Sequence, residues 1–240
     1  MKPIAIFRHS AADGPAYLAD FLREAHHPFI EIRVDEGEKI PSHASPFSGI
    51  ALMGGPMSVN DDLPWIKHSL ALIQDAYTQH IPLLGHCLGG QLMSKALGGT
   101  VSRNPAGKEI GWHEIEIVDP ALGQHWLGNS DRFYAFHWHG EIFTLPTGAQ
   151  WLARSEHCTN QAFVMGPHIG MQFHIEMDEA TIADWCQGGE IEIRAALNKP
   201  DVHTAVNTTE QIQQLTPHAL PLMRKHTHYL YRRWIENLRH

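Results

Sequence analysis

Short apolar segments alternate with helical patterns over the first hundred residues, and this alternation limits the possible folds more than any other feature of the chain. Runs typical of β-strands at residues 4–7, 29–34 and 50–53 are interrupted by a helical pattern at residues 16–25. Such an alternation is typical of βαβ units around a parallel sheet. We therefore expect an α/β fold with a mostly parallel central sheet.

The pattern changes after this region. Between residues 100 and 173 many short strand-like runs follow one another, which predicts an antiparallel extension of the sheet. Strand signals are missing from residues 178–240, where Pro200, Pro217 and Pro221 are expected to separate helical pieces. Because 240 residues fit one α/β domain, residues 1–240 are predicted to form a single domain, with residues 178–240 as a helical part packed on it.

Composition argues against several kinds of partner. The chain has 18 Lys and Arg and 26 Asp and Glu, which gives a net charge of -8. It has no run of basic residues that could follow a phosphate backbone, so no nucleic-acid partner is expected. No apolar run has the length of a membrane span and no signal-like segment follows Met1, so we expect a cytoplasmic protein without a membrane partner. Three separate cysteines without a CxxC pair indicate neither a disulfide framework nor a cysteine-based zinc site.

One of these cysteines lies in an unusual turn. The segment 84–91, with sequence LGHCLGGQ, places Cys87 where a predicted strand at residues 81–84 turns into a predicted helix at residues 88–97. The glycines allow a sharp turn, and a thiol at a helix N-terminus is favoured as the reactive thiolate. A free cysteine is also a common small core residue, so this turn alone leaves both interpretations open. Cys158 and Cys186 lack such a turn and are interpreted as core residues.

A thiolate nucleophile needs a base, and the base needs a group that orients it. His174 and Glu176 follow the predicted strand at residues 169–173 and stand two residues apart, a spacing that puts both side chains on one face if the strand continues. A glycine turn, Met53-Gly54-Gly55-Pro56, follows another predicted strand and could present backbone N–H groups to an oxyanion. Sites in open α/β sheets form at the carboxyl ends of strands, where all three elements are expected.

Together, GHCLGGQ, the His-x-Glu pair and the MGGP loop resemble the class I glutamine amidotransferases, whose elbow reads GxCxGxQ. The resemblance covers about residues 40–178 and is strongest to stand-alone domains similar to the glutaminase part of GMP synthase. It implies a three-layer, flavodoxin-like sandwich. Two departures are Ile175, where the family usually has proline, and Glu141, where it often has aspartate.

The resemblance also implies roles for residues. Cys87 would attack the side-chain amide of glutamine to form a thioester, His174 would transfer protons, and Glu176 would orient His174. Gly55 and Leu88 would offer the oxyanion-hole amides. The substrate would be held by residues that match the family's binding positions, namely Gln91, Trp138, His139, Gly140 and Glu141.

The resemblance implies no cofactor, and glutamine as the substrate. No GxxxxGK[ST] loop is present, so an ammonia acceptor would be bound by a separate synthase or acceptor-binding protein. Two alternatives remain. A γ-glutamyl hydrolase or cysteine peptidase would use the same triad, whereas a non-catalytic binding or regulatory domain would keep the fold without turnover.

The histidines raise the question of a metal site. His137 and His139 share a predicted strand face, and His9, His86, His157 and His168 are available elsewhere. No HExxH motif occurs and no third ligand can be placed, so no metal site is predicted.

Overall fold

The computed structural model describes residues 1–198 and 205–239, and Pro200 lies outside them. In this part of the chain a nine-stranded sheet forms the centre, in the order β2-β1-β3-β4-β11-β10-β9-β6-β7. Its strands are β1 (Ile4–Arg8), β2 (Phe29–Arg33), β3 (Gly49–Leu52), β4 (Leu83–His86), β6 (Glu109–Ile117), β7 (Arg132–His139), β9 (Gln150–Arg154), β10 (Ala162–Met165) and β11 (His168–Met171). A two-stranded sheet joins β5 (Val101–Arg103) to β8 (Glu141–Phe143).

The sheet is parallel in one half and antiparallel in the other. Adjacent strands are parallel in the half of the sheet that runs β2-β1-β3-β4-β11. Adjacent strands are antiparallel in the other half, which runs β11-β10-β9-β6-β7. The predicted parallel sheet with an antiparallel extension is confirmed. All residues of β3 and β4 are buried, because helices cover both faces of the parallel half.

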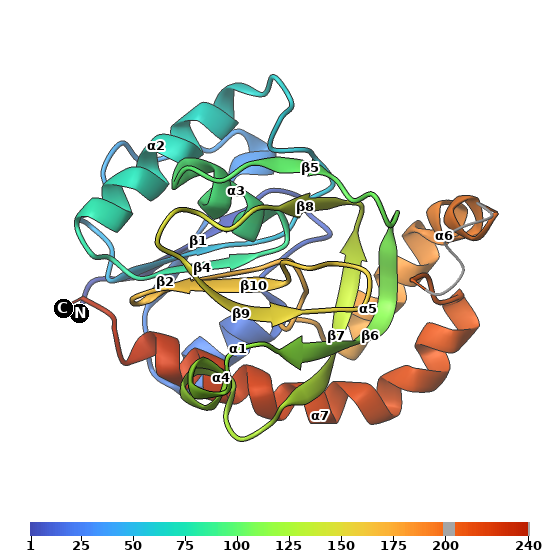
Figure 1. Ribbon diagram of the computed structural model, residues 1–240. Coiled ribbons are helices and arrows are strands. Elements are labelled where there is room, and N and C mark those ends of the chain that lie inside the picture. Colours follow the sequence, from blue (N-terminus) through green and yellow to red (C-terminus); the bar gives the residue numbers. More distant parts are fainter. Residues whose placement is uncertain (199–204, 240) are drawn as a thin grey trace.

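Helices form the two outer layers (Figure 1). On one face, α2 (Pro64–Thr78) and α3 (Leu88–Ala96) pack through Leu72, Ile73, Leu92 and Met93. On the other, α1 (Ala16–Glu24), α4 (Pro120–Leu127), α5 (Glu179–Gly188) and α7 (Thr209–Ile235) share a second core. The 3-10 helix η1 (Val34–Glu36) follows β2, and α6 (Glu190–Leu197) lies at one end (Figure 1). The two cores confirm the expected three-layer arrangement.

The C-terminal helix departs from the prediction. Pro217 and Pro221 lie within α7, a continuous helix of 27 residues, and do not separate helical pieces. A proline leaves the carbonyl four residues before it without a helical partner. Both prolines and Gln213 are exposed, so the carbonyls of residues 213 and 217 can bind water, while Ile212, Thr216 and Met223 pack inward. The single-domain assignment of residues 1–240 stays a prediction.

Two strand boundaries also differ from the prediction. The strand predicted at residues 81–84 is β4, which continues to His86 because Gly85 and His86 pair with Gly170 and Met171 of β11. The strand predicted at residues 169–173 ends at Met171. No described helix is both long and apolar enough to cross a membrane. The cytoplasmic location stays a prediction.

Candidate active site

Cys87 occupies a strained turn between β4 and α3. Its backbone has φ 49° and ψ -107°, a left-handed φ that non-glycine residues adopt rarely. The turn brings α3 against two strands: a Cβ on Gly89 would lie 2.1 Å from the carbonyl oxygen of Leu52, and one on Gly90 would lie 2.3 Å from that of Met171. Only glycine permits these approaches. The sequence GHCLGG therefore fixes a thiol at the carboxyl end of the central strand.

His174 and Glu176 form a buried pair beside this turn. Nδ1 of His174 lies 2.6 Å from Oε1 of Glu176. The pair does not lie on a continued β11, as the two-residue spacing suggested. Instead the backbone N–H of His174 donates to the carbonyl of Phe136 at 2.8 Å, which anchors the segment against β7. The contact with Glu176 occupies Nδ1 of the imidazole and leaves Nε2 for another partner.

The two groups stabilise each other's charged form. Burial disfavours the imidazolium, yet the charges of Glu176 and Cys87 raise the pKa of His174 well above its ordinary value. Burial likewise disfavours the carboxylate, but His86 and His174 lower the pKa of Glu176 to about 2. Nε2 of His174 is buried and has no hydrogen-bond partner among the described residues. The side chain of His174 lines the same cavity as Cys87.

Helix α7 holds the backbone of the segment that contains His174 and Glu176. Thr227 donates through Oγ1 to the carbonyl of Ile175 at 3.1 Å, and Nη2 of Arg224 donates to the carbonyl of Met177 at 2.6 Å. These bonds hold the backbone on both sides of Glu176. No sequence motif in the C-terminal helices predicted this role.

Gln172 is a site residue that the sequence motifs did not reveal. Its Nε2 donates to Sγ of Cys87 at 3.5 Å, and its Oε1 accepts from Nε2 of Gln91 at 3.2 Å. Both glutamines are buried. The sequence feature that could have identified Gln172 is its position as a polar residue inside the apolar run 169–173. Buried polar groups usually have a defined hydrogen-bond partner.

The glycine turn after β3 lies beside the elbow. A Cβ on Gly55 would approach Cδ2 of Leu88 at 2.8 Å, so the two residues nominated for the oxyanion hole are in contact. Leu88 begins α3, and its backbone N–H has no partner within the helix. Gly55 lines the same cavity as Cys87 and His174.

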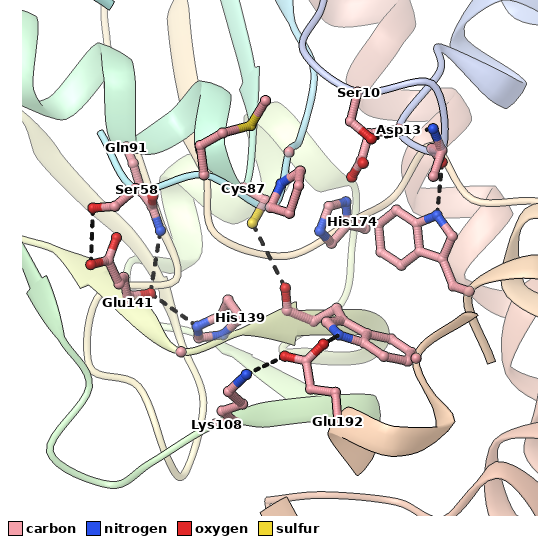
Figure 2. Close-up of a pocket in the computed structure, with 18 of the residues that line it drawn as sticks. Ser10, Asp13, Ser58, Cys87, Gln91, Lys108, His139, Glu141, His174 and Glu192 are labelled. Carbon is pink, nitrogen blue, oxygen red and sulfur yellow. Dashed lines mark hydrogen bonds and ion pairs between the residues drawn. The ribbon is translucent and has the colours of Figure 1, made fainter. Parts of the chain in front are cut away.

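The segment from Trp138 to Glu141 forms the opposite wall (Figure 2). Sγ of Cys87 lies 3.9 Å from the carbonyl of Trp138, and Oε1 of Glu141 accepts from Oγ of Ser58 at 3.0 Å. The carbonyl of Glu141 accepts from Nε2 of Gln91 at 3.3 Å. The side chain of Gln91 therefore bridges the elbow helix and this wall, and Gly140 also lines the cavity.

The cavity has a volume of about 970 Å³ and an acidic lining. Carboxylates from separate elements face it, namely Asp13, Asp61, Glu141, Asp184 and Glu192; its cationic side chains are Arg103 and Lys108. Lys108 is paired with Glu192. Burial raises the pKa of Asp13. The cavity can thus hold a polar molecule next to the sulfur, and its rim favours positively charged groups.

The remaining cysteines are buried, and His9 and His168 bind the backbone of neighbouring segments. Cys158 and Cys186 are buried, and burial raises the pKa of Cys158 to about 12, so its thiol stays protonated. Nδ1 of His9 lies 3.0 Å from the carbonyl of Met53, and Nδ1 of His168 accepts from the backbone N–H of Leu83. His137 and His139 lie together, and Glu109, which no sequence motif singled out, lies between them.

Comparisons with known proteins agree with this geometry. The family model for glutamine amidotransferase class-I matches residues 17–182, a longer range than the 40–178 expected from the motifs. A glutamine amidotransferase crystal structure from Methylobacillus flagellatus has a TM-score of 0.95 and 40% identity, over 100% of this chain and 96% of that one. Another from Thermotoga maritima has a TM-score of 0.86 and 28% identity, over 98% of each chain.

Curated proteins with similar sequences also include glutamine amidotransferase-like proteins and glutamine-hydrolysing enzymes. The glutamine amidotransferase-like protein YfeJ of Salmonella typhimurium is 30% identical over 70% of this chain and 72% of its own length. The GMP synthase of Lactobacillus acidophilus is 36% identical over 54% of this chain, and the match spans only 24% of that protein. With the family match, these similarities lead to one assignment: the chain belongs to the class-I glutamine amidotransferases.

Proposed function

We propose that this protein hydrolyses the side-chain amide of glutamine through a thioester on Cys87. The observation that carries the proposal is that His174, held 2.6 Å from the buried Glu176, lines the same cavity as a thiol at a strained strand-to-helix turn. A nucleophile, a base and a group that orients the base are the parts that acyl transfer through sulfur requires.

The reaction follows from these positions. The Cys87 thiolate attacks the amide carbon, and the N–H groups of Gly55 and Leu88 stabilise the oxyanion that forms. The C–N bond then breaks as His174 gives its proton to the departing ammonia, which leaves a γ-glutamyl thioester. His174 next takes a proton from water, whose oxygen attacks the thioester. The C–S bond breaks, and glutamate leaves with the thiolate restored.

Substrate binding is assigned to the opposite wall. Gln91, Trp138, His139, Gly140 and Glu141 would hold glutamine, with Gln91 fixed by Gln172 and by the carbonyl of Glu141. A relative 35% identical over 54% of this chain is a glutamine-hydrolysing GMP synthase subunit from Thermococcus kodakarensis. We infer that the ammonia acceptor is bound by a separate synthase protein.

The direct test is a substitution of the nucleophile. Cys87→Ala should abolish ammonia release from glutamine and labelling by a glutamine-like electrophile, with the fold retained by circular dichroism. Cys158→Ala is the matched control, because that thiol is buried away from the cavity. Ammonia release by the Cys87→Ala protein at the wild-type rate would reject the mechanism.

The size of the cavity favours a second candidate function. A volume of about 970 Å³ lies near the upper end of the range for drug-sized ligands, which is more room than free glutamine needs. A γ-glutamyl hydrolase acting on a larger γ-glutamyl amide would use the same triad. The ratio of kcat/KM for glutamine and for γ-glutamyl amides separates the two activities, while a purely regulatory domain would turn over neither.

A further inference from the structure

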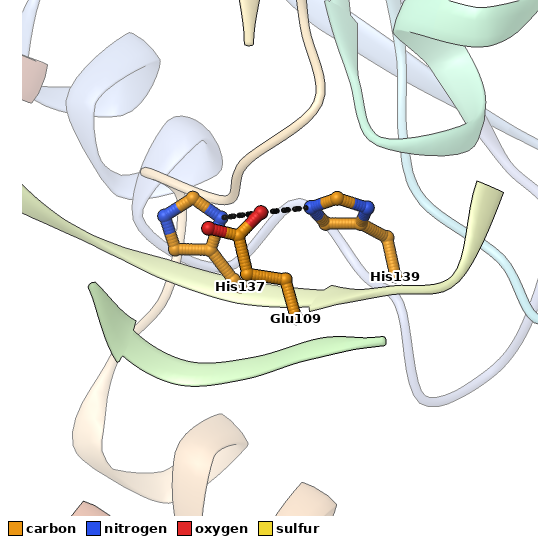
Figure 3. Close-up of side chains that lie close together, drawn as sticks. All are labelled: Glu109, His137 and His139. Carbon is orange, nitrogen blue, oxygen red and sulfur yellow. Dashed lines mark hydrogen bonds and ion pairs between the residues drawn. The ribbon is translucent and has the colours of Figure 1, made fainter. Parts of the chain in front are cut away.

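A second group of chemically active side chains lies on β6 and β7, away from the sulfur. Glu109 is the cross-strand partner of His139, and His137 lies two residues earlier on the same face of β7. One potential ligand atom from each of the three lies within 4.8 Å of the others (Figure 3). Glu109 and His137 are completely buried, and His139 is 5% exposed.

The hydrogen bonds of His139 assign its tautomer. Its Nδ1 lies 3.1 Å from the backbone carbonyl of Glu141, which can only accept, so Nδ1 carries a hydrogen. In the neutral ring the lone pair is then on Nε2, which lies 3.0 Å from Oε2 of Glu109. Two acceptors at this distance repel each other unless a cation or an extra proton lies between them.

His137 also has one ring nitrogen on the side of the Glu109 carboxylate. Its Nδ1 lies 3.8 Å from Oε2 of Glu109 and 3.5 Å from the amide nitrogen of Gln161. The two hydrogens of that amide have nearer acceptors in Oε2 of Glu109 at 2.7 Å and Oγ of Ser155 at 3.0 Å, so Nδ1 of His137 can present its lone pair toward the carboxylate when the ring carries its hydrogen on Nε2. Both imidazoles can therefore offer a ligand electron pair on the side of the Glu109 carboxylate.

The buried carboxylate of Glu109 needs a positively charged partner. Oε2 of Glu109 accepts from Gln161 at 2.7 Å, which uses one of its lone pairs, and Oε1 has no partner among the described residues. Within the described ranges its ion pairs are with His137 and His139 alone, and neither Lys nor Arg contacts it. Burying a carboxylate is costly unless a countercharge is provided.

We propose that Glu109, His137 and His139 bind a divalent transition-metal cation, with Zn²⁺ as the ion that suits two imidazoles and one carboxylate. Ligand atoms around tetrahedral zinc are about 3.3 Å apart, given bonds of about 2.0–2.1 Å. The separations of 3.0 and 3.8 Å from Oε2 of Glu109 lie on either side of this value. All three ligand atoms lie within 4.8 Å of one another, so side-chain movements that close these separations would complete the site.

Two cavities give access to this position. His139 lines the candidate active site, whereas Glu109 lines a second cavity of about 470 Å³ together with His113, Ser155 and His157. A water molecule from either side can supply the fourth ligand. The bound ion would fix His139, whose Nδ1–H holds the carbonyl of Glu141, and so would order the substrate-facing wall. The metal site does not depend on the proposed glutaminase activity.

The test is zinc binding by full-length protein that carries Cys87→Ser, so that the catalytic thiol cannot provide a ligand. After treatment with a chelator and its removal, titration with ZnCl₂ against a chromophoric competitor should give one ion per chain. Glu109→Gln and His137→Asn should each weaken binding about 100-fold, since each removes one ligand. His68→Asn, an exposed histidine on α2, is the control and should not change the affinity.

The coordination can be read directly by X-ray absorption at the zinc edge. The proposal requires nitrogen and oxygen ligands at about 2.0–2.1 Å, with an imidazole signature and no sulfur shell. Failure to bind one ion, a sulfur shell, or affinity unchanged in both variants would overturn it. If Glu109→Gln does not fold by circular dichroism, His137→Asn and the absorption spectrum decide the question.

Discussion

Tyr231, in the last third of α7, shares a hydrogen bond with His86, the residue before Cys87: the phenol oxygen lies 3.1 Å from Nε2 of the imidazole. The same nitrogen lies 3.7 Å from Oε2 of Glu176. All three side chains are buried. The C-terminal helix is thus connected to the carboxylate of Glu176 through the imidazole of His86, which lies 145 residues before Tyr231 in the sequence.

Tyr231→Phe tests this positioning role. Loss of the hydroxyl leaves a buried imidazole nitrogen without its partner, so unfolding should require about 1–3 kcal/mol less free energy. The carboxylate of Glu176 would be held less firmly, and kcat for ammonia release should fall several-fold with KM unchanged. Tyr229→Phe, an exposed tyrosine on the same helix, is the control. An equal loss of kcat in both variants would contradict the role.

The stability of the protein should depend on Glu176 in a defined pH range. Its pKa in the folded state, about 2, is lower than the ordinary value of 4.5, so its contribution to stability is full above pH 4.5 and is lost as the pH falls toward 2. The contribution is on the order of 3 kcal/mol. Urea unfolding at a series of pH values should show wild type losing stability below pH 4.5 relative to Glu176→Gln. Parallel pH profiles of the two proteins would rule this out.

Gln172→Met should slow the proposed glutamine hydrolysis while Cys87, His174 and Glu176 all remain in place. The substitution deletes the donor to the sulfur of Cys87 and the acceptor for Gln91. Hydrogen bonds to charged groups contribute about 1.5–3 kcal/mol, so kcat/KM for glutamine and the rate of alkylation by iodoacetamide at fixed pH should each fall about tenfold or more. Gln187→Met, on the exposed side of α5, should leave both rates unchanged.

Gly90→Ala should destabilise the fold through the elbow. The new Cβ would lie 2.3 Å from the backbone oxygen of Met171, and neither the strand nor the helix can move without disturbing the other. We expect a loss of about 3 kcal/mol or more in thermal or urea unfolding. Gly188→Ala, at the end of α5 with nothing within 4 Å of the added Cβ, should be neutral or slightly stabilising. Equal stability of the two variants would refute this account of the turn.

Features that depend on neighbouring residues could be predicted from the sequence. The βαβ alternation follows from local apolar periodicity, and the elbow at Cys87 follows from glycines within a few positions of it. The glycines and the thiol are sufficient to predict where the sulfur lies, because a strand that runs directly into a helix must turn there.

Features that depend on distant partners could not be predicted in this way. Gln172 contacts a cysteine 85 residues away, and Glu109 contacts His139 across a strand pair 30 residues apart in sequence. The prediction that Pro217 and Pro221 separate helical pieces is wrong. The effect of a proline depends on which side of the helix faces water, and the helical pattern alone does not reveal that side.

The continuity of α7 sets a practical limit on protein engineering. The family match ends at residue 182, but Arg224, Thr227 and Tyr231 bind the segment around Glu176, and the histidine next to it, from outside that range. A chimera that transplants residues 17–182 alone would carry Cys87 and His174 without these supporting contacts. A transplanted unit that keeps the geometry of the site has to include the last long helix.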